Sequence, residues 1–86
     1  MRPRQSSRMT RLGDLDAPFA FKRGDRVAWV RFDESPDLEF SGVVVDGVCE
    51  YLAAVGIQTA AFLVKRDDGS YFVADQRNLM RIPPQG

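Results

Sequence analysis

Residues 62–75 constrain the fold more than any other part of the sequence. Two runs rich in β-forming residues, 62–66 and 71–75, are separated by Asp67-Asp68-Gly69-Ser70. An Asp-Gly pair between two such runs is typical of a β-hairpin, because both residues tolerate the positive φ of a type I′ turn. We therefore predict a hairpin with a type I′ turn at Asp68-Gly69.

Two further strands are predicted before this hairpin. Residues 26–32 follow a turn at 22–25 and are apolar on both faces, which suits a strand inside a small barrel or against a partner. Residues 33–39 are interpreted as a polar loop in which Pro36 excludes a central strand. Residues 40–46 form the next predicted strand, and Gly42 allows a bend or bulge there.

Residues 48–61 fit two interpretations. Val48, Leu52 and Val55 would share one face of a helix that ends at Gly56. A strand, a turn near Gly56 and another strand fit equally well, and we favour this strand–loop–strand arrangement. After the hairpin, residues 76–78 resemble one turn of 3₁₀ helix and 79–82 a short closing strand.

These elements predict an all-β protein, a small SH3-like barrel of about five strands. Barrel closure removes most exposed strand edges, which protects a small β domain from aggregation. A chain of 86 residues holds one such domain, which we place at residues 18–84. The strand that is apolar on both faces further suggests a homo-oligomer, either a dimer or a tetramer.

Basic residues are concentrated before the barrel. Four arginines precede the first acidic residue, so residues 1–12 are strongly basic and the remainder carries the balancing excess of acid. We interpret residues 1–17 as a disordered, flexible basic arm that contacts nucleic acid or an acidic surface. The alternative is a solvated tail that aids solubility. The arginines are Arg2, Arg4, Arg8 and Arg11.

Composition excludes several function classes. The chain has no histidine and a single cysteine, Cys49, so imidazole catalysis, a Cys/His zinc site and an internal disulfide are excluded. The acidic loop of Asp33, Glu34, Asp37 and Glu39 lacks the spacing of a calcium loop, and we predict no metal site. No apolar run reaches the ~20 residues of a membrane span, and no secretory signal is present, so we expect a cytoplasmic protein.

Three short motifs carry a family resemblance. They are Gly24-Asp25-Arg26-Val27, Ser41-Gly42-Val43-Val44-Val45 and the ending Leu79-x-Arg81-Ile82. Their order resembles SH3-like barrels of the KOW and Tudor type, and more specifically the plasmid-encoded type II dihydrofolate reductases. That resemblance covers about residues 19–82. It implies a tetramer around a central pore that binds NADPH and folate, and a gene carried on a mobile element.

The catalytic residues of those reductases do not carry over to this chain. The family has Val-Gln-Ile-Tyr in the strand after the last hairpin, where this chain has Tyr71-Phe72-Val73-Ala74. The family also has a basic residue two positions after the Val of Gly-Asp-Arg-Val, where this chain has Trp29. A pore without those polar groups could not orient a nicotinamide against a pterin.

Aromatic residues supply two candidate binding features. One is a Tudor-like cage for a methylated basic side chain through cation–π attraction, although a small core needs several aromatics for its own packing. Its candidate members are Trp29, Phe32, Phe40, Tyr71 and Phe72. The other is a patch of Tyr71 beside Lys65 and Arg66, which could stack a nucleic-acid base.

Together these observations predict a non-enzymatic SH3-like barrel that binds or regulates a macromolecular partner, either nucleic acid through the arm or a protein. We expect no catalytic residues and no cofactor. The alternative is a divergent type II dihydrofolate reductase-like protein whose oligomeric pore binds NADP or a folate-like ligand. The predicted partner-binding residues are Arg2, Arg4, Arg8, Arg11, Trp29, Lys65, Arg66 and Tyr71.

Overall fold

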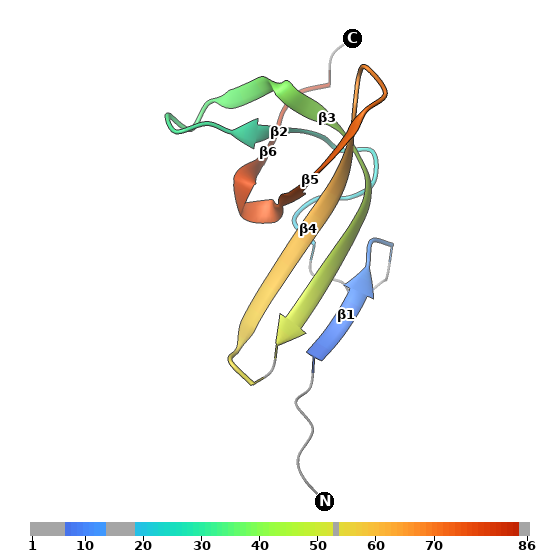
Figure 1. The fold of residues 1–86 in the computed structure, drawn as a ribbon, viewed down its shortest axis with the longest axis vertical. Coiled ribbons are helices and arrows are strands. Elements are labelled where there is room, and N and C mark those ends of the chain that lie inside the picture. Colours follow the sequence, from blue (N-terminus) through green and yellow to red (C-terminus); the bar gives the residue numbers. More distant parts are fainter. Residues whose placement is uncertain (1–6, 14–18, 53, 85–86) are drawn as a thin grey trace, which may run out of the picture.

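A computed structural model describes residues 7–13, 19–52 and 54–84 of the chain (Figure 1). Within this part, six strands form one antiparallel sheet in the order β5-β4-β3-β2-β6, with β1 added to β3. The prediction of an all-β, barrel-like small domain is therefore confirmed. The elements are β1 (Ser7–Arg11), β2 (Arg26–Val30), β3 (Pro36–Leu52), β4 (Ile57–Arg66), β5 (Tyr71–Asp75), the 3₁₀ helix η1 (Gln76–Asn78) and β6 (Leu79–Arg81).

The paired strands β3 and β4 run through the whole domain (Figure 1). At Gly42 the two backbones approach so closely that a Cβ would lie 2.1 Å from the carbonyl oxygen of Lys65, so only glycine fits there. Further along, Val45 has no partner on β4, because the register shifts between Val44 and Asp46. This bulge reverses the alternation of side chains, so that Val44 and then Gly47 lie on the core side.

The core lies where β2, β3 and β4 pack together. Its fully buried side chains are centred on Phe62, whose ring meets the rings of Phe19 and Phe21 edge-on at centroid distances of 5.6 and 5.3 Å. Edge-to-face pairs of this kind stabilise a core beyond the area that they bury. The other fully buried large side chains are Val27, Val44 and Val64.

The strand–loop–strand interpretation of residues 48–61 is confirmed. β3 continues through Leu52, a turn follows at 54–56, and β4 begins at Ile57. Gly56 has a φ of 67°, which suits the turn. β1 and β4 flank the two sides of β3 here, so backbone pairing outweighs the weak helical periodicity.

The hairpin predicted at 62–75 is also confirmed, but the predicted type I′ turn is wrong. Gly69 has a φ of 89°, whereas Asp68 does not have the positive φ that a type I′ turn needs. The amide of Gly69 donates to the carbonyl of Arg66, and the amide of Arg66 donates to Ser70. These bonds define a three-residue loop with glycine in the left-handed position, the next most common hairpin connection.

The prediction of a flexible arm at residues 1–17 is wrong for part of that range. Residues 1–6 and 14–17 lie outside the described residues, but Ser7–Arg11 form β1, paired with Val48–Leu52 of β3. The Leu12 amide then donates to Gly47, and Leu12 packs against the core. A strand at a sheet edge is held by backbone pairing and does not need apolar side chains. The arginine-rich sequence of this segment therefore gave no sign that it forms a strand.

The polar loop predicted at 33–39 is shorter in the structure. β3 already begins at Pro36, which pairs with Val30. Proline is tolerated as the first residue of a strand, because its missing N–H is not needed there. The strand predicted at 26–32 ends at Val30.

Both faces of β2 are occupied within one chain. Val27 and Ala28 point to opposite faces and are both buried. The apolar character of β2 is thereby explained without a partner, and it no longer argues for self-association. The predicted 3₁₀ turn and closing strand are confirmed as η1 and β6, and β6 pairs with β2.

Candidate functional site

The most irregular part of the sheet lies between β2 and the start of β3. Ala28 pairs with Ser41, but the next residue, Trp29, pairs with Asp37. Residues 38–40 therefore have no partner on β2 and bulge out of the sheet. Bulges of this kind redirect side chains and are frequent beside functional sites.

Side chains satisfy the backbone groups that this bulge removes from the ladder. The hydroxyl of Ser41, which is buried, donates to the Leu38 carbonyl at 2.9 Å. The Glu39 amide donates to the Asp37 carboxylate at 3.1 Å, and the Arg66 guanidinium donates to the Glu39 carbonyl. These contacts give backbone groups of the bulge partners outside the ladder and so stabilise its conformation.

Beside the bulge lies a small, mostly apolar pocket of about 290 Å³, lined by Trp29, Asp37, Phe40, Phe72 and Val73. Phe40 meets Phe72 edge-on, with ring centroids 6.0 Å apart and planes at 88°. Trp29 remains 37% exposed and Phe40 44% exposed, although both are large apolar side chains. Exposed aromatics grouped around a cavity are a feature of binding sites.

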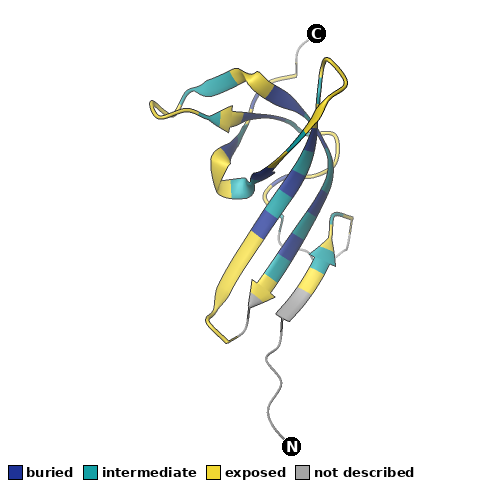
Figure 2. Ribbon diagram, viewed as in Figure 1, coloured by how far each residue is buried: buried dark blue, intermediate teal, exposed yellow. Residues whose placement is uncertain are grey.

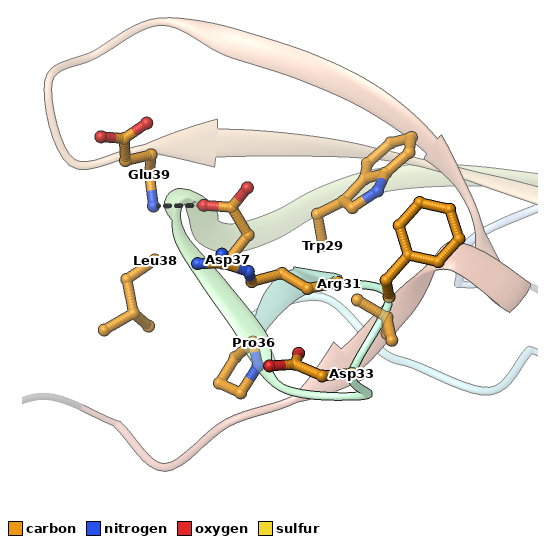
Figure 3. Close-up of a pocket in the computed structure, with 9 residues that line it drawn as sticks. Trp29, Arg31, Asp33, Pro36, Asp37, Leu38 and Glu39 are labelled. Atoms are coloured by element: carbon orange, nitrogen blue, oxygen red, sulfur yellow. Dashed lines mark hydrogen bonds between the residues drawn. The ribbon is translucent and has the colours of Figure 1, made fainter.

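A wider concavity of about 1060 Å³ adjoins this pocket along residues 29–39. Figure 3 shows Trp29 and Asp37 on the same side of the connecting loop, with the Glu39 amide bonded to Asp37. The concavity has an excess of negative charge, because three acidic residues, Asp33, Asp37 and Glu39, and one basic residue, Arg31, line it. Hydrogen bonds from the hydroxyl and amide of Ser35 hold the pKa of Asp33 below its usual range, so that this carboxylate keeps its charge.

Arg66, a predicted partner-binding residue, helps to build this site. Its guanidinium lies 5.3 Å from the centre of the Phe40 ring, and its side chain also contacts Ser70 at 3.4 Å. A carboxylate oxygen of Asp68 lies 3.8 Å away. Arg66 thus connects the β4–β5 loop to the bulge and is a positioning residue.

Lys65 and Tyr71 do not line either the pocket or the concavity. They are paired across β4 and β5, so their side chains share one face of the sheet, and both are exposed. Arg66, the next residue along β4, points to the other face. The predicted patch of Tyr71 with Lys65 and Arg66 is therefore divided between two faces.

The predicted arginines of the N-terminal segment lie in and before β1. Arg11 forms an ion pair with Asp46 at 2.6 Å, and Arg8 is paired in the backbone register with Tyr51. The Gly47 amide and the Arg11 guanidinium lower the pKa of Asp46. Arg2 and Arg4 lie outside the described residues.

The described residues contain no cluster of three or more Cys, Asp or Glu side chains that could hold a metal ion. The thiol of Cys49 is buried and accepts a hydrogen bond from the Gln58 amide at 3.4 Å. Its burial agrees with the structural role that a lone cysteine usually has.

Sequence reasoning found three aromatics of the pocket but not its acid. Trp29, Phe40 and Phe72 were candidates for a cage, whereas Asp37 was interpreted as part of a solvated loop. The bulge that brings Asp37 opposite Trp29 has no signature in the sequence beyond Pro36 and the polar residues around it. Phe32, another candidate, lines the wide concavity and is fully exposed.

Comparison with protein-family models, with curated proteins and with solved structures finds no match for this chain. Among the described residues, no helix has the length and apolar character needed to span a membrane.

Proposed function

We propose that this protein is a non-enzymatic SH3-like barrel that binds a segment of a partner protein through the pocket at Trp29. The observation that carries the proposal is the group of exposed aromatic side chains around an acid, held by a fixed bulge. The SH3-like assignment is supported by the sheet order β5-β4-β3-β2-β6 and by the 3₁₀ turn that leads from β5 into β6.

The chemistry of the pocket favours a basic side chain. A guanidinium or ammonium group over an aromatic ring gains about 0.5–2 kcal/mol, depending on how far it is desolvated. Arg66 over Phe40 is an example of this contact within the chain. Asp37 adds a negative charge at the pocket wall, and along the concavity Asp33 and Glu39 outweigh the one basic residue there, Arg31.

The same charges favour a protein over a nucleic acid at this site, because carboxylates repel phosphate groups. Arg66 and Arg11 also already have acidic or carbonyl partners within the chain. Nucleic-acid binding through the N-terminal arginines is the competing function, and a labelled duplex distinguishes it from peptide binding.

Trp29 provides a direct test, because it is the single tryptophan of the chain. We would titrate the full chain with an acetylated, amidated Gly-Arg-Gly-Arg-Gly peptide and follow tryptophan fluorescence. The control peptide has citrulline in place of arginine, which keeps the shape and removes the charge. We expect a saturable change with the arginine peptide, weakened by salt, and little response to the citrulline peptide.

A matched pair of variants locates the effect. Asp37→Asn keeps the oxygen that accepts from Glu39 and removes only the charge, so arginine-peptide binding should weaken about three- to tenfold. Asp46→Asn makes the same change outside the pocket and should leave binding unaltered. Equal binding of both peptides would contradict recognition of a cation, and binding of neither would contradict the proposed function.

Two further titrations test the competing functions. Salt-sensitive binding of a duplex that is lost when residues 1–12 are removed would favour a nucleic-acid partner. A saturable response of Trp29 to NADPH would favour the reductase-like alternative. Under the proposed function, neither ligand changes the emission of Trp29.

A further inference from the structure

The start of β4, beside the turn at residues 54–56, has one edge without a strand partner in the described part of the chain, and we call this end of the sheet the turn end. β5 pairs with residues 61–65 of β4, whereas residues 57–60 pair only with β3 in the described part of the chain. In an antiparallel strand, successive residues direct their N–H and C=O groups to alternate sides. Half of the backbone groups in residues 57–60 therefore face outward, and Figure 2 shows this end of β4 as exposed.

This edge lacks the features that usually prevent pairing. Edge strands are commonly protected by charged residues, proline or bulges. Residues 51–64 contain no charged residue and no proline, and the register of residues 57–60 with β3 is regular. By contrast, the sequence of the edge strand β1 contains two charged residues, Arg8 and Arg11.

Apolar side chains accompany the open edge. Ile57 is 50% exposed, and Val55 in the turn is 62% exposed. Both would lose exposed surface if another strand lay alongside β4. The turn end therefore combines outward backbone groups that can pair with another strand and exposed apolar surface whose burial would be favourable.

We propose that a second copy of this chain pairs with residues 57–60 of β4, in an antiparallel arrangement about a two-fold axis. Such an interface is self-complementary, since each residue i faces j and each j faces i. An axis at Gln58 or at Thr59 keeps equivalent faces of the two sheets on the same side. Residues 57–60 of the two copies then pair without placing like charges opposite each other and without burying an unpaired charge.

The absence of charge also argues for a second copy over a different protein. Interfaces between different chains obtain much of their specificity from complementary charges and from repulsion of wrong partners. Residues 57–60 offer only backbone groups and uncharged side chains. The pocket at Trp29 lies at the other end of β3, so pairing between the turn ends of two copies leaves the pocket open.

Sedimentation equilibrium of the full chain over a range of concentrations tests the proposal. We expect a reversible shift from the mass of one chain to that of two. Thr59→Lys brings two ammonium groups close to the two-fold axis in either register, and should raise the dissociation constant at least tenfold. The matched control, Met9→Lys, places the same charge at an exposed position of β1, and should still dimerise.

Hydrogen exchange of the unmodified chain gives a second readout that does not depend on a variant folding. Alternate amides among residues 57–60 should exchange more slowly at high concentration than at low concentration, while amides of β1 should not change. A chain that stays monomeric with concentration-independent exchange would overturn the proposal. A dimer that Thr59→Lys leaves intact, with the variant's fold verified by circular dichroism, would also overturn it.

Discussion

The two ends of β3 treat their backbone groups in opposite ways. At the pocket end, residues 38–40 leave the sheet, and the side chains of Ser41, Asp37 and Arg66 replace the lost ladder contacts. At the turn end, the pairing of β3 with β1 and β4 is regular, and the outward backbone groups of residues 57–60 have no strand partner in the described part of the chain.

This difference shows how one sheet can present two kinds of surface. A bulge whose polar groups are satisfied internally can display side chains, since its backbone needs nothing from a ligand. A regular strand edge with uncharged side chains instead presents its backbone N–H and C=O groups for pairing. The pocket end is therefore suited to recognition through side chains, and the turn end is suited to pairing with another strand.

The largest effect should come from a substitution in the core, which supports both ends of the sheet. Phe62→Ala removes the ring at the centre of the core and should destabilise the domain by about 3–5 kcal/mol, enough to unfold much of it. Leu63→Ala, on the other face of β4, should cost clearly less. Urea denaturation of both variants checks this, and equal losses would contradict a core centred on Phe62.

A smaller change should loosen the pocket end alone. Ser41→Ala leaves the Leu38 carbonyl without its donor and should cost about 1–2 kcal/mol. Hydrogen exchange should quicken around residues 38–41 and remain unchanged at residues 57–60. Equal acceleration at both places would show that the two ends do not open independently.

Acid should weaken the barrel through Asp25. The Lys22 amide, and then the Arg81 guanidinium at 2.8 Å, lower the pKa of Asp25 below its usual 3.8. Because the folded-state pKa is depressed, this stabilisation is present above about pH 4 and is lost as the pH falls through the folded value. Asp25→Asn should therefore flatten the loss of stability between pH 5 and pH 2 in denaturant titrations. An unchanged slope would assign the acid sensitivity to other carboxylates.

The smallest effect is expected at the ion pair between β1 and β3. Arg11 is 73% exposed in its side chain, so its pairing with Asp46 is screened by solvent. Arg11→Ala should change the free energy of unfolding by less than about 0.5 kcal/mol. Thermal denaturation at low and high salt checks this, and a large salt-dependent loss would show that charge, rather than backbone pairing, holds β1 in place.

Local signals predicted the elements that local physics determines. The hairpin at 62–75 follows from β-forming runs around Asp-Gly, and the 3₁₀ turn at 76–78 from its position before a closing strand. The helical alternative at 48–61 failed because pairing on both sides of β3 is a long-range interaction. The same holds for β1, whose partner lies about 40 positions away in the register.

The candidate site was less predictable than the fold for the same reason. The aromatics could be recognised as a set, but their grouping around Asp37 depends on the bulge of residues 38–40. The bulge depends in turn on Arg66, which reaches it from β4. The interpretation of Arg66 as a partner-binding residue missed this role, because no pattern in the sequence joins it to Glu39.

The unpaired residue at Val45 has a consequence for how this chain can evolve. A strand without a bulge has one alternation, so any inserted or deleted residue exchanges inside for outside along all that follows. Val45 is the extra residue of a bulge: without it, Val44 would still pair with Val64 and Asp46 with Leu63, so Val48 and Cys49 would keep their present faces. The bulge is therefore a position in β3 where the chain can gain or lose one residue without exchanging the buried and exposed sides of either half.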